Sequence, residues 1–230
     1  MADRSDRSLV DAVRAALQAV ADPAAAEPMR AYMKSSMPFL GVPTPARTAA
    51  LRPVLAGRPL TDPATWRGTV RTLFRDAAYR EERYAALAIA RRYPAHLMAE
   101  PAPSLDLLDE VIVTGAWWDF VDEAAIRLLG PLLLGHPDTV RPAVRRWACD
   151  ADRWRRRAAV ICQIGAKERT DTALLAEAIE ANLADPDFFL RKGIGWALRQ
   201  HARVDPDWVR AFAATHDLSP LSRREALKHL

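Results

Sequence analysis

The chain has 230 residues, half of them hydrophobic, and a formal net charge of +4. It is long enough to bury a full core, and no apolar run approaches the roughly 18 residues of a membrane span. The polar start of the chain predicts no signal peptide, and no membrane partner is expected. Cys149 and Cys162 lack metal-ligand spacing, which predicts buried thiols in a reducing, cytoplasmic setting.

Helical periodicity runs through almost the whole chain. A capping residue followed by proline marks several helix starts, at Asp22, Thr44, Asp62, Asp185, Asp205 and Ser219. The predicted helices, in chain order, are 7–20, 24–36, 45–56, 63–76, 80–93, 104–114, 118–134, 138–149, 152–165, 171–184, 187–201, 206–214 and 220–229.

These short helices are joined by short loops, whereas a four-helix bundle has fewer and longer ones. Helix pairs recurring every 35–45 residues or so indicate an all-α fold, a curved α-solenoid of degenerate HEAT-like helix pairs. No linker or low-complexity tract interrupts the chain, so we expect one domain over 1–230. The concave face of such a solenoid suits a rod-like ligand.

Trp118 and Asp122 are the first candidate site residues, because residues four apart share one helix face. Together with Arg157 and Trp196 they could hold a cationic, electron-poor ring beside a negative charge. The alternative is a core tryptophan next to a solvated acid. Trp117 and Trp154 are expected in the core.

Two further features have open interpretations. Gly193 and Gly195 lie inside a predicted helix, where they allow close approach of either a neighbouring backbone or a ligand. Basic groups recur late in the chain, and they form either a stripe that follows a phosphate backbone or solvated helix faces. These groups are Arg145-Arg146, Arg153 to Arg157, Arg191-Lys192 and Arg223-Arg224 with Lys228.

Several classes of enzyme are excluded by missing motifs. The five histidines show no HExxH or HxE spacing, and there is no CxxC, P-loop, GxSxG or GxGxxG. We therefore expect no metal and no cofactor.

Five segments resemble the AlkD-type DNA alkylpurine glycosylases, which belong to the DNA alkylation repair proteins with HEAT-like repeats. They occur in order along nearly the whole chain. The segments are AYMKSSMPFLGVPTPAR (31–47), WWDFVD (117–122), WRRRAAVICQ (154–163), LRKGIGWALRQHARVDPDWVRAF (190–212) and LSPLSRREALKHL (218–230).

The resemblance implies a role for each matched residue. Asp122 matches the catalytic carboxylate, Trp118 and Trp196 match the indoles that flank the lesion deoxyribose, and Arg157 matches the arginine beside them. The matched and basic positions expected to bind DNA are Phe188, Phe189, Arg199, Tyr32, Arg223 and Arg224.

The expected function is hydrolysis of the N-glycosidic bond of cationic N3- or N7-alkylated purines, such as 3-methyladenine and 7-methylguanine, in double-stranded DNA. The resemblance implies that the base is not enclosed in a pocket, and that a monomer acts in the cytoplasm, near the bacterial nucleoid. The alternative is a non-catalytic HEAT-like scaffold that binds damaged or branched DNA, or a protein partner.

Overall fold

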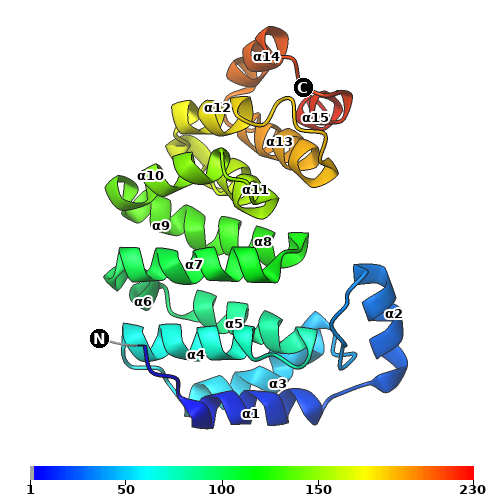
Figure 1. The fold of residues 1–230 in the computed structure, drawn as a ribbon, viewed down its shortest axis with the longest axis vertical. Coiled ribbons are helices and arrows are strands. Elements are labelled where there is room, and N and C mark those ends of the chain that lie inside the picture. Colours follow the sequence, from blue (N-terminus) through cyan, green and yellow to red (C-terminus); the bar gives the residue numbers. More distant parts are fainter. Residues whose placement is uncertain (1–2) are drawn as a thin grey trace. The chain divides into compact units, whose positions relative to one another are not determined.

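The computed structural model describes residues 3–230, and all the regular elements in this part of the chain are helices (Figure 1). They form two compact units, Met1–Glu100 and Pro101–Leu230. The predicted all-α class is therefore confirmed. None of the helices in residues 3–230 is both long and apolar enough to cross a bilayer.

The first unit places buried helix faces around one core. Its helices are α1 (Arg7–Gln18), α2 (Pro23–Met33), α3 (Thr44–Gly57), α4 (Pro63–Arg75), α5 (Arg80–Arg92) and α6 (Pro94–Ala99). Helix α4 packs against α5, and α1 packs against α3, α4 and α5. Leu9, Trp66 and Ile89 are fully buried at these contacts, where the loss of water-exposed apolar area stabilises the fold.

The loop before α3 is fixed by a buried acid. The Glu81 carboxylate accepts the backbone N–H groups of Leu40, Gly41 and Val42, each at 3.0 Å. Three hydrogen bonds offset the desolvation of a fully buried carboxylate. Gly41 has a positive φ of 81°, and a Cβ there would lie 1.9 Å from the Asp22 carbonyl oxygen.

The second unit stacks short helices in successive layers (Figure 1). Helix α7 packs on α8, α10 on α11, α11 on α13, and α13 on α15. The elements are α7 (Pro101–Gly115), α8 (Trp118–Ala124), η1 (Ala125–Leu129), α9 (Gly130–Gly135), α10 (Pro137–Ala148), α11 (Arg153–Ile161), η2 (Lys167–Arg169), α12 (Thr172–Glu180), α13 (Phe188–His201), α14 (Pro206–Thr215) and α15 (Pro220–Ala226).

The helix predicted over 118–134 is continuous but not regular. A π-helical turn, η1, separates α8 from α9. Pro131 follows this turn, and since proline has no N–H, local widening of the helix accommodates it. A Cβ on Gly130 would lie 2.3 Å from the Cys162 carbonyl oxygen, so the absence of a side chain lets α11 approach here.

Four of the six predicted helix starts are confirmed. Asp22, Asp62, Asp205 and Ser219 each cap a helix with a side-chain oxygen. The predicted capping residue is wrong at Thr44, which is the first residue of α3 and follows the N-cap Pro43.

It is also wrong at Asp185. Helix α13 starts later, after Asp187, whose carboxylate accepts the N–H groups of Phe189 and Leu190. Asp185 instead accepts the N–H of Asp187. Helix α6 and the early start of α7 were not predicted, because Tyr93 and Glu100 before their first prolines are not favoured capping residues.

The two cysteines differ. Cys162 is buried as predicted, and burial raises the pKa of its thiol to about 12. Cys149 is exposed at the end of α10, so the prediction of a buried thiol is wrong there.

Candidate active site

An ion pair between α8 and α11 brings two of the candidate residues together. Arg157 Nε donates to Asp122 Oδ1 at 2.7 Å, and Arg157 Nη2 donates to Asp122 Oδ2 at 2.8 Å. The exposed fraction of the side chain is 15% for Asp122 and 5% for Arg157. Two parallel bonds from a rigid guanidinium fix both the position and the plane of the carboxylate.

The local backbone places Trp118 above this carboxylate along α8. Ala116 adopts a left-handed φ of 44° and Trp117 is extended, so the chain turns out of α7 and starts α8 at Trp118. Asp122 follows one turn later, on the same helix face. Both side chains are partly exposed.

Arg157 also reaches α13, the helix that carries Trp196. Its Nη1 donates to the Phe189 carbonyl oxygen. A Cβ on Gly193 would lie 3.0 Å from Arg157 Nη1, so this glycine leaves room for the guanidinium. Trp196 follows Gly193 at i+3, close to the same face of α13, and is partly exposed. One arginine thus connects the helices of all four candidate residues.

The glycine pair is explained by packing. Gly193 accommodates Arg157, while a Cβ on Gly195 would lie 2.5 Å from Glu225 Cβ and 2.8 Å from the Ser222 carbonyl oxygen. Gly195 therefore lets α15 approach α13. Close approach of a neighbouring backbone is therefore confirmed for Gly195, whereas the neighbours of Gly193 are the side chains of Arg157 and Ile161.

Burial and the neighbouring Arg157 have opposite effects on the ionisation of Asp122. Burial raises the pKa of the Asp122 carboxyl, the hydrogen bonds and charge of Arg157 lower it, and the nearby Asp119 raises it; the net direction is upward. The carboxylate is thus poorly solvated and oriented by one cation, an arrangement that can stabilise a positive charge developing beside it.

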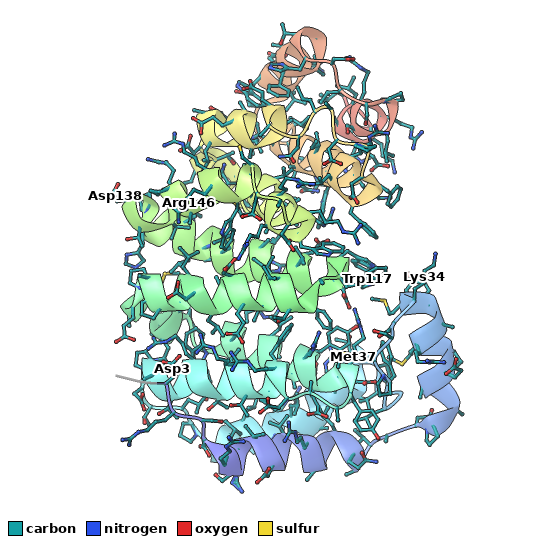
Figure 2. The ribbon with its side chains drawn as sticks, in the orientation of Figure 1. Asp3, Lys34, Met37, Trp117, Asp138 and Arg146 are labelled. Carbon is teal, nitrogen blue, oxygen red and sulfur yellow. The ribbon has the colours of Figure 1, made fainter. Side chains whose placement is uncertain are left out.

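An aromatic cluster supports the starts of α8, α11 and α13. The ring centroids of Trp117 and Phe189 are 5.6 Å apart, those of Trp154 and Phe189 5.2 Å, and those of Trp117 and Trp154 6.2 Å. Trp154 is buried, as predicted, whereas Trp117, at the tip of the α7–α8 turn, is only half-buried (Figure 2). The cluster sets the spacing of the three helices that carry the site.

The candidate DNA-binding residues fall in different environments. Phe189 packs into the aromatic cluster, whereas Phe188 is 56% exposed and has Lys192 Nζ 5.8 Å from its ring centroid. Arg199 is paired with Glu225, and Arg223 and Arg224 are exposed on α15. Tyr32, 81% exposed, belongs to α2 of the first unit.

Most arginines proposed for a basic stripe are engaged by carboxylates. Arg145 binds Glu177, Arg153 binds Asp187, Arg155 binds Asp109 and Arg156 binds Asp185. These four guanidinium groups are thus paired with acids from other segments of the chain, and phosphate binding by them stays a prediction.

Some features of the site could not be read from single motifs. The Phe189 carbonyl group and Gly193 both serve Arg157, and their i,i+4 spacing on α13 was the only sequence signal. In residues 3–230, no cluster of histidine, cysteine, aspartate or glutamate side chains could hold a metal ion.

Comparison with known proteins decides the family. The family model described as DNA alkylation repair enzyme matches residues 13–230. The chain belongs to this family. A solved structure described as a predicted DNA alkylation repair enzyme from Enterococcus faecalis is 29% identical, with a TM-score of 0.78, and the match covers 91% of this chain and 96% of that one. No protein with a curated description matches the chain.

Membership of the DNA alkylation repair family confirms the resemblance seen in the sequence and implies that the chain binds DNA. The structural match is consistent with the predicted helical solenoid.

Proposed function

We propose that this DNA alkylation repair protein is a monofunctional glycosylase that removes cationic N3- or N7-alkylated purines from double-stranded DNA. The observation that carries the proposal is the Asp122 carboxylate, partly buried and held by two hydrogen bonds from Arg157. It shares a helix face with the indole of Trp118. No enclosing pocket is required, because the charge of the base marks the lesion.

The chemistry needs little acid catalysis. As the bond between C1′ and the purine nitrogen breaks, its electron pair goes to the cationic base, which leaves neutral, and the sugar becomes an oxocarbenium ion. Asp122 stabilises this cation. Water adds to C1′ and loses a proton to Asp122 or to solvent, giving the abasic sugar.

The remaining site residues act on the same charged nucleoside. Trp118 and Trp196 supply cation–π attraction. Arg157 is a positioning residue, which aims the carboxylate and keeps it ionised. No lysine occupies the matched catalytic positions, so the reaction has no Schiff-base step and stops at the abasic site.

DNA is held by residues outside this centre. We assign phosphate contacts to Arg223 and Arg224, with Arg199, Phe188, Phe189 and Tyr32 completing the duplex surface. The family domain extends over both compact units, since the family model spans 13–230. The protein acts as a monomer on nucleoid DNA.

Chromatography of the released base tests the proposal. Excess protein is incubated with a duplex containing one 7-methylguanine, beside the same duplex with guanine. We expect free 7-methylguanine from the first duplex only, and no strand break before alkaline treatment. Binding of the methylated duplex without base release would favour the non-catalytic scaffold.

A further inference from the structure

The helix that carries Asp122 meets α11 at two points. At the first point Asp122 pairs with Arg157. At the second point Gly130 lies so close to the end of α11 that a Cβ would come within 2.3 Å of the Cys162 carbonyl oxygen. Both α8 and the π-helical turn η1, which links α8 to α9, pack against α11. The face of the helix that meets α11 therefore includes both Asp122 and Gly130.

A regular α-helix would not direct both of these residues at α11. Each residue turns an α-helix by roughly 100°, so residue i+8 lies roughly 80° around the helix from residue i, whereas residue i+7 lies about 20° away. The Gly130 N–H donates to the Ala125 carbonyl oxygen, five positions back, which is the bond that defines a π-helical turn. The turn takes up one extra residue, so Gly130 lies where residue i+7 of a regular helix would lie relative to Asp122.

The residues that follow η1 favour the π-helical turn. Pro131 has no N–H, so it cannot form the bond to the Arg127 carbonyl oxygen that a regular α-helical turn requires. Gly130 has no side chain, so the turn can lie against the carbonyl group at the end of α11. A Cβ there would press on backbone atoms, which cannot move aside as a flexible side chain can. π-Helical turns inside α-helices are frequent at functional sites.

We propose that Gly130 is a positioning residue for Asp122, and that the π-helical turn aligns the Asp122 carboxylate with the guanidinium group of Arg157. The inference rests on the proposed role of Asp122 in base release. Two parallel bonds of 2.7 and 2.8 Å tolerate little rotation of α8. The contact at Gly130 fixes that rotation, because α8, η1 and α9 follow one another without a break.

Misalignment of α8 would change the ionisation of Asp122. Burial raises the pKa of the Asp122 carboxyl, the bonds and charge of Arg157 lower it, and Asp119 raises it. A rotation of α8 lengthens the bonds from Arg157, so the poorly solvated carboxylate loses compensation and its pKa rises further. A purely structural role of Gly130 would lower the stability of the fold without this change.

Gly130→Ala tests the proposal, with Gly68→Ala as the matched control. Gly68 belongs to α4 of the first unit, where a Cβ would come within 2.3 Å of the Arg4 carbonyl oxygen. Both variants therefore place a methyl group against a backbone oxygen at the same distance. NMR titration of the aspartate carboxyl carbons gives the midpoint of Asp122, whose signal is identified by its loss in Asp122→Asn. Single-turnover release of 7-methylguanine gives the effect on the reaction.

We expect Gly130→Ala to raise the titration midpoint of Asp122 and to slow base release at neutral pH about tenfold, as for the loss of one charge-assisted hydrogen bond. Gly68→Ala should change neither quantity. An unshifted midpoint in folded Gly130→Ala would overturn the proposal, and so would an equal shift in Gly68→Ala.

Pro131→Ala keeps the test decisive where Gly130→Ala fails to fold. Pro131 is partly exposed, and alanine restores an N–H that favours a regular α-helical turn. The midpoint of Asp122 should again rise, and an unshifted midpoint in this variant would then overturn the proposal. The titration needs no base release. A protein that shows the shift but releases no base would therefore reject the proposed function and retain the positioning role.

Discussion

Arg155 and Arg157 lie two residues apart on α11, and each binds an aspartate of a neighbouring helix through two hydrogen bonds. Arg155 holds Asp109 of α7 at 2.7 and 2.8 Å, the same distances that join Arg157 to Asp122. The two pairs differ in their surroundings. Asp109 and Arg155 have 32% and 28% of their side chains exposed, against 15% and 5% for Asp122 and Arg157.

This difference in exposure goes with different pKa shifts in the two ion pairs. The bonds to Asp109 raise the pKa of Arg155 further above its ordinary value, so that pair is simply stabilised as charged. At Asp122, burial outweighs the pull of Arg157 and raises the pKa of the carboxyl. The same two hydrogen-bond distances therefore join a more exposed ion pair in one place and a poorly solvated carboxylate in the other.

Asparagine substitutions of Asp122 and Asp109 are expected to give the largest difference, in the rate of base release. We expect Asp122→Asn to lower single-turnover release of 7-methylguanine at least 100-fold, because the variant loses the charge that stabilises the cationic sugar. Asp109→Asn removes the same charge from the more exposed pair and should stay within about twofold of the unmodified protein. Circular dichroism checks that both variants fold. Equal rates for the two variants would reject Asp122 as the catalytic carboxylate.

Alanine substitutions of the two arginines test the difference in burial. Arg157→Ala leaves a poorly solvated carboxylate without its partner and should lower the free energy of unfolding by about 3 kcal/mol. Arg155→Ala should lower it by about 1 kcal/mol or less, since solvent and other groups replace the lost bonds. Urea denaturation measures both values. Equal losses would mean that the two ion pairs are energetically alike.

Substitution of the two candidate indoles should have a smaller effect on base release. Trp118→Ala and Trp196→Ala are each expected to slow release of a cationic purine by roughly 2- to 30-fold, which corresponds to about 0.5–2 kcal/mol of cation–π attraction. Affinity for undamaged duplex serves as the control and should hardly change, because it comes from phosphate contacts. If both variants release the base at an unchanged rate, the cation–π role is rejected and these tryptophans serve only in packing.

Arg223 and Arg224, which have no carboxylate partner among residues 3–230, should act only on DNA affinity. The slope of log affinity against log salt is expected to be roughly −3 to −6, and Arg223→Ala with Arg224→Ala should reduce its magnitude by up to about two. Arg145→Ala is the control, because Arg145 is bound to Glu177. Fluorescence anisotropy at several salt concentrations gives the slopes, and equal slopes for the double variant and the unmodified protein would remove this pair from the DNA surface.

The sequence predicted much of this architecture because helix periodicity and capping are local signals. Asp62 and Asp205 begin helices where expected. Local signals failed where geometry over several residues decides the outcome, as at Asp185, whose side chain caps the loop while Asp187 caps α13. The π-helical turn before Pro131 also depends on packing against α11.

For the site, spacing placed Trp118 and Asp122 on one face, and the resemblance supplied Arg157 and Trp196. The ion pair between Asp122 and Arg157 joins residues 35 positions apart, which no local pattern can predict. The same limit explains why the ion pairs of Arg153, Arg155 and Arg156 could not be predicted from the sequence. Their clustering looked like a phosphate-binding stripe, but their acidic partners come from other segments of the chain.

The pH dependence of single-turnover base release tests the role of Asp122 most directly. A purine alkylated at N7 stays cationic across the acidic range, so the rate should follow the ionisation of the carboxylate. Because burial raises the pKa of Asp122, we predict that the rate falls with decreasing pH below an apparent pKa clearly above the ordinary aspartate value of about 3.9. A rate that stays level down to about pH 4, or one that falls only at the ordinary value, would contradict the account.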